Sequence, residues 1–255
     1  LYGGYPWRYY IIFKSLNQQE FFDNYYGFWQ RLVSDEDKTQ LFQEDVFKKM
    51  DISEPRKVFE RVFTFNKKLK YDTPEQHIKN SLYFEIKTFL PGLLIVGDKL
   101  SMANGLEERF PFLDNDLIDF AQKIPIRHKL GNLEKLKKLD ENFMGNKKNA
   151  YLEFDDGKNV LRKAMADFLP EKILNRKKQG FSAPDESWYR GENAAYVKEL
   201  LMNNKTASAE FINPQYIEKI VDEHIHKHIN HRLLIWSFMN FEWWCRIFLN
   251  NEKIN

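Results

Sequence analysis

The segment Lys99–Asp114, KLSMANGLEERFPFLD, places Glu107 and Arg109 two residues apart between apolar runs. Asn104-Gly105 favours a chain reversal before them, and Pro111 disfavours helix just after them. We therefore expect Glu107 and Arg109 on an irregular segment between two packed elements, where proteins commonly hold functional side chains. The alternative is a buried Glu–Arg pair that braces two helices.

Lys158 is the second residue whose position could serve chemistry. The run KNVLRKAMADFL predicts an amphipathic helix over residues 158–169, ended by Pro170, with Leu161, Met165 and Phe168 on its apolar stripe. Lys158 then lies in the first turn, where the helix dipole favours anions. A cation there indicates an anionic ligand nearby, or else an ordinary exposed lysine.

Two other polar groups allow a functional and a plain interpretation. The basic run before Gly180-Phe181 could bind phosphate, although short basic runs are usually solvated. His224, His228 and His231 share one helical face, as zinc ligands can. No cysteine or HExxH arrangement supports zinc, so we predict no metal site and interpret these histidines as surface or packing residues.

The elements that must position these residues are mostly helical. Apolar residues recur at helical spacing from Leu16 to Tyr71. Thr73-Pro74 with Gln76 predicts a capped helix start. The following helix carries an apolar face, with Lys87 beside it, and Pro91-Gly92 breaks or kinks the pattern. The apolar face is expected to comprise Ile78, Leu82, Ile86 and Phe89.

Beyond Asp114 the pattern predicts a helix that stops at Ile124-Pro125, then a lysine-rich exposed insertion over residues 129–150. Residues 151–157 could form a small β-hairpin. The last helix, which contains Leu233, Trp236, Phe238, Phe241, Trp244 and Phe248, is apolar on much of its circumference and is expected to be buried. The predicted fold is therefore mostly α, a single bundle-like unit.

Composition excludes several classes of protein. A net charge of +2 over 255 residues gives no bulk field for nucleic acid or a membrane surface, and no apolar run is long enough to span a bilayer. The single cysteine excludes an internal disulfide and suits a reducing, cytoplasmic location. The 22 Phe, 12 Tyr and 6 Trp predict a well-packed interior or large contact surfaces. Because the chain opens at Leu1 without a signal pattern, we expect a fragment of a longer protein.

Taken together, these segments resemble the synthetase domain of the glutamine-hydrolysing asparagine synthetase family. The resemblance is carried, in the family's order and approximate spacing, by LYGGYPWRY, KTFLPGLLIVGDKLSMANGLEERFPFLD, GKNVLRKAMADFLP, RKKQGFSAP and the aromatic LLIWSFMNFEWW. It implies that residues 1–255 are the helical C-terminal portion of an ATP pyrophosphatase-type (adenine-nucleotide alpha-hydrolase-like) domain.

In that family ATP and Mg²⁺ serve to adenylate the side-chain carboxylate of aspartate, and glutamine-derived ammonia then displaces AMP. The resemblance implies that Lys158 is the catalytic lysine at the phosphate and the tetrahedral intermediate, and that Arg109, oriented by Glu107, lies on the wall of this site. Lys87 and Arg162 are the implied pyrophosphate- or substrate-binding residues. Arg162 could instead be structural.

The chain also departs from the family pattern. It contains no SGGxDS pyrophosphate loop and no glutaminase domain. The implied partners are therefore upstream nucleotide-binding and glutaminase domains, and the fragment is expected to be inactive alone and able to associate with itself through exposed apolar surface. Two alternatives stay open: an amidotransferase for another carboxylate, such as a surface-sugar acid, and a non-catalytic helical module that binds a partner.

Overall fold

A computed structural model describes residues 14–30, 32–130, 158–176, 185–203, 206–226 and 229–252. The described parts are mostly helical, as predicted, and their β pairing is an isolated antiparallel bridge between Phe42 and Ile212. The chain divides into two compact units rather than the single unit expected from its sequence. The predicted hairpin and all of the predicted insertion after Leu130 lie outside the described residues.

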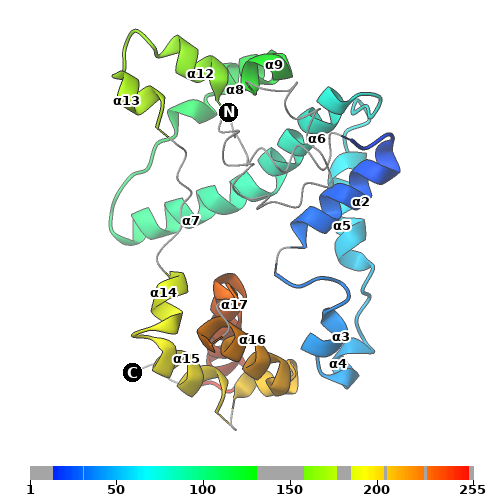
Figure 1. Ribbon diagram of the computed structural model, residues 1–255, viewed down its shortest axis with the longest axis vertical. Helices are drawn as coiled ribbons and strands as arrows, with labels where there is room; N and C mark the ends of the chain where they lie inside the picture. The colour runs from blue at the N-terminus through cyan, green and yellow to red at the C-terminus, as the bar shows by residue number, and fades with distance from the viewer. Residues whose placement is uncertain are drawn as a thin grey trace. The chain divides into compact units, whose positions relative to one another are not determined.

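Unit 1 comprises residues 1–29 and 55–178. In its described residues, helices follow one another along the chain and no sheet is formed (Figure 1). They are α2 (Gln18–Trp29), α5 (Glu54–Thr64), α6 (Pro74–Lys87), α7 (Phe89–Ala103), the 3₁₀ turn η1 (Pro111–Leu113), α8 (Asn115–Lys123), α9 (Ile126–Lys129), α12 (Asn159–Ala164) and α13 (Glu171–Leu174).

Aromatic rings fill the core of unit 1. Phe21 of α2 meets Phe63 of α5 edge to face, with ring centroids 5.5 Å apart. Phe84 of α6 stacks on Phe63 at 5.3 Å and lies 5.0 Å from Phe59. Such pairs stabilise the packing beyond the area they bury. Aromatic residues therefore form the interior of this unit. This agrees with the first of the two interpretations of the aromatic content, a well-packed interior rather than large contact surfaces.

The start of α6 confirms the predicted cap. The Thr73 hydroxyl accepts a hydrogen bond from the Gln76 backbone at 3.3 Å, and the Gln76 side chain accepts one from the Thr73 backbone at 3.2 Å. This reciprocal capping box satisfies two otherwise orphaned donors. The predicted apolar face was wrong at its end, because Ile86 is 36% exposed and α6 stops at Lys87, so Phe89 belongs to the next helix.

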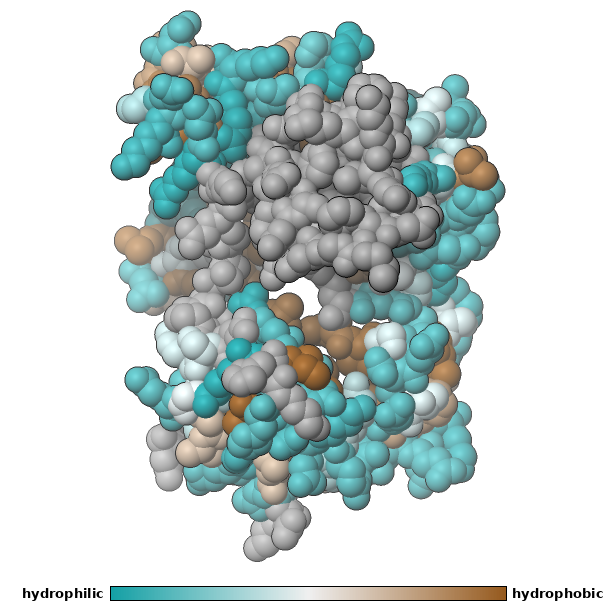
Figure 2. Space-filling view, viewed as in Figure 1, coloured by the Kyte–Doolittle hydropathy of each residue, from teal (hydrophilic) through white to brown (hydrophobic). Residues whose placement is uncertain are grey.

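Helix α7 is apolar yet has no buried residue. It begins directly after Thr88, and Pro91 lies in its first turn, where a missing backbone donor costs little. The chain therefore breaks at Thr88 rather than at Pro91-Gly92. Its exposed apolar side chains include Leu93, Ile95, Val96, Leu100 and Met102. Apolar side chains also reach the surface among hydrophilic ones elsewhere in the molecule (Figure 2).

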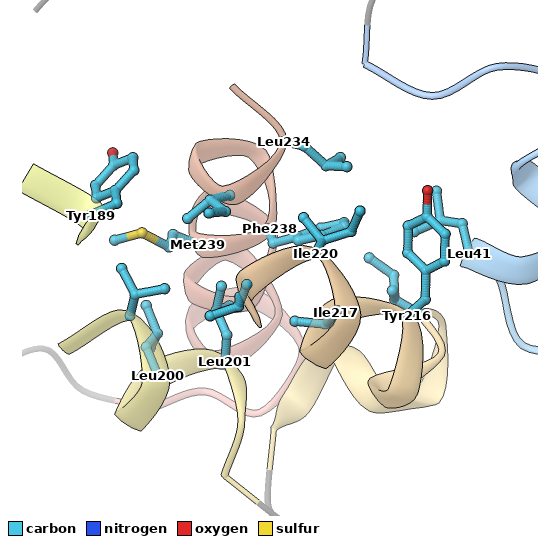
Figure 3. Packing of buried hydrophobic residues seen from close by; sticks show 14 residues of the cluster. Leu41, Tyr189, Leu200, Leu201, Tyr216, Ile217, Ile220, Leu234, Phe238 and Met239 are labelled. Carbon is cyan, nitrogen blue, oxygen red and sulfur yellow. The ribbon is translucent and has the colours of Figure 1, made fainter. Parts of the chain in front are cut away.

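Unit 2 comprises residues 30–54 and 179–255. Its elements are α3 (Lys38–Leu41), α4 (Glu44–Phe47), α14 (Asp185–Arg190), α15 (Ala194–Leu201), the 3₁₀ turn η2 (Ala207–Glu210), α16 (Pro214–His226), α17 (Arg232–Trp244) and the π-helical turn η3 (Cys245–Leu249). The core joins α15, α16 and α17 and includes Leu201, Ile217, Ile220, Ile235 and Phe238 (Figure 3).

The expectation of a wholly buried last helix was wrong in part. Leu234, Ile235, Phe238 and Met239 of α17 are buried, whereas Leu233, Trp236, Trp244 and Phe248 are each about half exposed or more. An apolar circumference therefore does not mean burial on every side in this unit. No helix in the described ranges is long and apolar enough to cross a membrane.

The end of α17 holds a buried carboxylate. Glu242 accepts hydrogen bonds from the backbone nitrogens of Ala207 and Ser208, at 2.9 and 2.8 Å, and from Arg246 Nε at 2.7 Å. Burial alone would raise the pKa of Glu242, but these donors outweigh it and hold the pKa below its ordinary value. The charge therefore ties η2 to the end of α17 within unit 2.

Candidate functional site

The segment between α7 and η1 has the irregular conformation predicted from its sequence. Gly105 has a φ of +68°, which reverses the chain after α7 and suits glycine. The backbone nitrogen of Leu106 then donates to the carbonyl of Ser101 at 2.9 Å. Phe110 is extended before Pro111, with φ −120° and ψ 81°. The return loop, defined here as residues 104–110, is thus fixed to α7 at its start.

Glu107 and Arg109 form an ion pair on this return loop. Arg109 Nε lies 3.0 Å from Glu107 Oε1, and the two side chains are 84% and 64% exposed, respectively. The alternative of a buried brace between two helices was wrong, because neither α7 nor α8 covers the pair. An exposed pair adds at most about 1 kcal/mol to stability. Its guanidinium can therefore still reach an anion.

Lys158 immediately precedes α12, in a left-handed conformation with φ 61° and ψ 29°. The prediction that it lies in the first turn was therefore wrong by one position. Its side chain is exposed. A residue with a Cβ rarely adopts this conformation, and such strain concentrates at functional sites.

Helix α12 is also shorter than predicted. It ends at Ala164, and Met165 leaves the helical region with φ −95° and ψ 4°. The predicted stripe fails at its last member, since Phe168 is 76% exposed. A chain of turns rather than a continuous helix leads to Pro170.

Arg162 extends across to the segment that follows α13. Its guanidinium donates to the backbone carbonyl of Leu174 and, at 3.4 Å, to that of Arg176. Carbonyls at a helix end lack partners within the helix, so a cation there satisfies them. This geometry favours the structural alternative for Arg162, which holds α12 against the end of α13.

Lys87 lies in the last turn of α6 and is exposed. Its Nζ lies 5.9 Å from the centroid of the Tyr83 ring, one turn earlier. A cation over an aromatic face at this distance is weakly attracted to it. The side chain is thus directed along α6 without an acidic partner among the described residues.

The structure brings only some of the predicted site residues together. Glu107 pairs with Arg109, but within the described ranges neither Lys158 nor Lys87 forms an ion pair or hydrogen bond with them. All of these residues, with Arg162, belong to unit 1. The candidate site therefore consists of three exposed cations, Lys87, Arg109 and Lys158, with Glu107 and the partly buried Arg162, all on one unit.

The histidines in unit 2 serve the connection between α16 and α17. His224 is fully buried, and its Nδ1 accepts a hydrogen bond from the backbone nitrogen of His231 at 3.1 Å. His231 Nε2 lies 2.9 Å from Glu223 Oε2. Among the described residues no group of three or more His, Cys, Asp or Glu could hold a metal ion; His228 lies outside them.

Sequence reasoning missed a contact beside the Glu107–Arg109 pair. The carboxylate of Glu108 lies against α7 at Gly97, where a Cβ would come within 2.6 Å of Glu108 Oε2. The sequence shows Glu107 and Glu108 only as two successive acids, so it did not indicate that one pairs with Arg109 and the other contacts α7. A glycine inside a helical pattern was the available signal, since it often marks close packing.

Comparison with known proteins places the chain in a family. The Asparagine synthase family model matches residues 1–246. Asparagine synthetase [glutamine-hydrolyzing] 1 of Bacillus subtilis (strain 168) is 32% identical over 177 residues, which are 69% of this chain and 24% of that protein. Asparagine synthetase [glutamine-hydrolyzing] 3 of the same organism is 23% identical over 224 residues, 87% of this chain and 31% of that protein.

Another relative carries a different name. Amidase chyE of Penicillium rubens (strain ATCC 28089 / DSM 1075 / NRRL 1951 / Wisconsin 54-1255) is 24% identical over 143 residues, 55% of this chain and 19% of that protein. No solved structure matches significantly. The chain thus spans about a quarter of the length of the first of these relatives. Since the family model covers nearly its whole length, the chain belongs to the asparagine synthase family.

Proposed function

We propose that this chain forms part of an ATP-dependent amidotransferase that converts a carboxylate to an acyl-adenylate and then to an amide. The observation that carries the proposal is the backbone of Lys158. The residue that the family resemblance assigns to catalysis is exposed and held in a left-handed conformation at a helix start. Strain of this kind costs about 1–3 kcal/mol and persists where the surrounding structure imposes it, often at functional sites.

The proposed reaction has two steps. A carboxylate oxygen attacks the α-phosphorus of ATP and pyrophosphate leaves; ammonia then attacks the acyl carbon and AMP leaves. Both steps develop negative charge on oxygen atoms, which a fixed cation stabilises. We assign this role to the ammonium group of Lys158 and propose that Arg109 binds the same anions, with Glu107 orienting its guanidinium. Lys87 is proposed as a further phosphate-binding cation, and Arg162 as the support of α12.

The exposed cations of unit 1 fit a polyphosphate, because ammonium and guanidinium groups bind phosphate oxygens. The described ranges contain no group of acidic or metal-binding side chains suited to Mg²⁺. We therefore propose that Mg²⁺ and most of ATP are bound by an upstream nucleotide-binding domain, and that a glutaminase domain supplies the ammonia. The much greater length of the matched relatives supports such partners.

Aspartate is the proposed substrate, on the ground that the matched Bacillus relatives are named asparagine synthetases. A different carboxylate, such as a surface-sugar acid, remains the alternative substrate. A non-catalytic binding module is the alternative function, and the exposed apolar side chains of α7 favour it, since large apolar patches mark interaction surfaces.

The test uses the native protein that carries this chain, with Lys158→Ala as the variant. Amide and glutamate are measured separately in the presence of ATP and glutamine. We expect ATP-dependent amide formation to fall at least about 100-fold, the usual cost of removing a donor to a developing oxyanion, while glutamine hydrolysis continues. Lys163→Ala is the matched control, because Lys163 is an exposed lysine of α12, the helix that Lys158 precedes.

Two results would contradict the proposal in different ways. Unchanged amide formation in Lys158→Ala would remove Lys158 from its assigned role. No ATP-dependent amide formation by the unmodified protein, with aspartate or with a panel of other carboxylates, would favour the binding module instead.

A further inference from the structure

Glu108 stands between the two members of the Glu107–Arg109 pair but makes a different contact. Glu107 and Arg109 pair with each other, whereas the Glu108 carboxylate lies against α7. The successive charged side chains of the return loop therefore do not share one partner.

The contact depends on the absence of a side chain at Gly97. A Cβ at this position would lie 2.6 Å from Glu108 Oε2 and 3.5 Å from Glu108 Cδ. Cβ atoms essentially never approach another atom as closely as the first of these distances. Any other residue at position 97 would therefore displace the Glu108 carboxylate from α7.

Glycine is unfavourable inside a helix, yet α7 contains two glycines, Gly92 and Gly97. A Cβ built at Gly97 would meet the Glu108 side chain. A Cβ at Gly92 would have nothing within 4 Å. The two glycines thus share a helix and a helical backbone, yet only one receives a side chain from the return loop. This difference isolates the contact from the general effect of glycine on helix stability.

We propose that Gly97 and Glu108 are positioning residues, which together set the direction in which the return loop presents Glu107 and Arg109. The inference rests on the proposed function, because it deepens the role given to Arg109. The hydrogen bond from Leu106 to Ser101 fixes the beginning of the loop, and the exposed Glu108 side chain lies against α7 at the middle of the loop. Replacing Gly97 displaces a side chain of the return loop and no backbone atom of another element, so we expect the effect to fall on the position of the loop rather than on folding.

The first arm of the test measures geometry without reference to activity. Backbone amide chemical shifts of residues 106–110 are recorded for this chain with Gly97→Ala, with Glu108→Ala and with both changes. We expect Gly97→Ala to shift these amides when Glu108 is present and to add nothing when Glu108 is already alanine, the signature of coupled residues. Gly92→Ala should leave them unchanged. Shifts that are additive, or equal for the two glycines, would overturn the inference.

The second arm measures carboxylate-dependent pyrophosphate release by the native protein. We expect Gly97→Ala and Glu108→Ala to lower kcat by about 10- to 100-fold, as small misplacements of a binding group do, with little change in melting temperature. Glu108→Gln, which retains the shape, should recover most of the rate, and Gly92→Ala should match the unmodified protein. Coupled amide shifts with an unchanged kcat would overturn the positioning role. An unmodified protein without pyrophosphate release would refute the proposed function, and the first arm would still decide the contact.

Discussion

Replacing Lys158 by glycine should stabilise the fold while it removes the proposed activity. At φ 61° and ψ 29° the Lys158 Cβ lies too close to the following carbonyl, which costs an L residue about 1–2 kcal/mol. Glycine avoids this cost but gives back about 0.5–1 kcal/mol through greater freedom of the unfolded chain. The net expectation is a gain centred on about 0.75 kcal/mol in the free energy of unfolding, and each 1 kcal/mol raises the melting temperature by about 2–4 °C at this chain length.

Lys158→Ala separates the backbone effect from the loss of the ammonium group. Alanine removes the charge but keeps the Cβ, so its melting temperature should stay near that of the unmodified chain. Thermal unfolding followed by circular dichroism measures both variants, and amide synthesis by the native protein measures their activity. If glycine and alanine at position 158 give the same melting temperature, Lys158 is not held in the left-handed region. If either variant retains full synthesis, the ammonium group of Lys158 has no catalytic role.

Three further expectations concern stability and reactivity. The folded pKa of Glu242 lies below its unfolded value, so the unfolded state binds more protons in acid and the stabilisation present at neutral pH is lost as the pH falls below 4.5. Glu242→Gln should flatten acid unfolding curves over that range; an unchanged midpoint would contradict this. Burial raises the pKa of the single thiol, Cys245, so a maleimide should label it only after unfolding, and rapid native labelling would disprove its burial. Thr73→Ala should lower the free energy of unfolding by about 1 kcal/mol in urea titrations, while a loss near zero would mean the capping box is not formed.

Local sequence signals predicted the helix boundaries that local chemistry controls. The capping box at Thr73 and the turn at Gly105 need only their own neighbours, and both are present. Burial was harder to predict, because it depends on which surfaces meet. Ile86 matched a helical face but is exposed, and Trp236 belongs to an apolar circumference that is only partly covered. The spacing of apolar residues indicates which face of a helix a side chain lies on, but it does not indicate whether another element covers that face.

The sequence proposed members for the candidate site but did not give their geometry. Residue types and family motifs selected Glu107, Arg109 and Lys158. The exposure of the Glu107–Arg109 pair then excluded the alternative of a buried brace between two helices. The left-handed backbone of Lys158 could not be predicted from a lysine, because a residue with a Cβ rarely adopts this conformation. The contact between Glu108 and Gly97 depends on the path of the return loop, which a single sequence does not determine.

The residues assigned to chemistry are confined to one of the two units. Every residue assigned to chemistry belongs to unit 1, whereas the buried charge of unit 2, Glu242, is engaged by η2 and Arg246. Substitutions in the core of unit 2 should therefore act on activity through folding. Helix α7 contributes to the proposed site through Gly97 but gains little from burial within its own unit, because none of its residues is buried. Since an apolar face is stabilised by removal from water, α7 should become more ordered when a partner covers it, whether that partner is a further domain of the native protein or a separate protein.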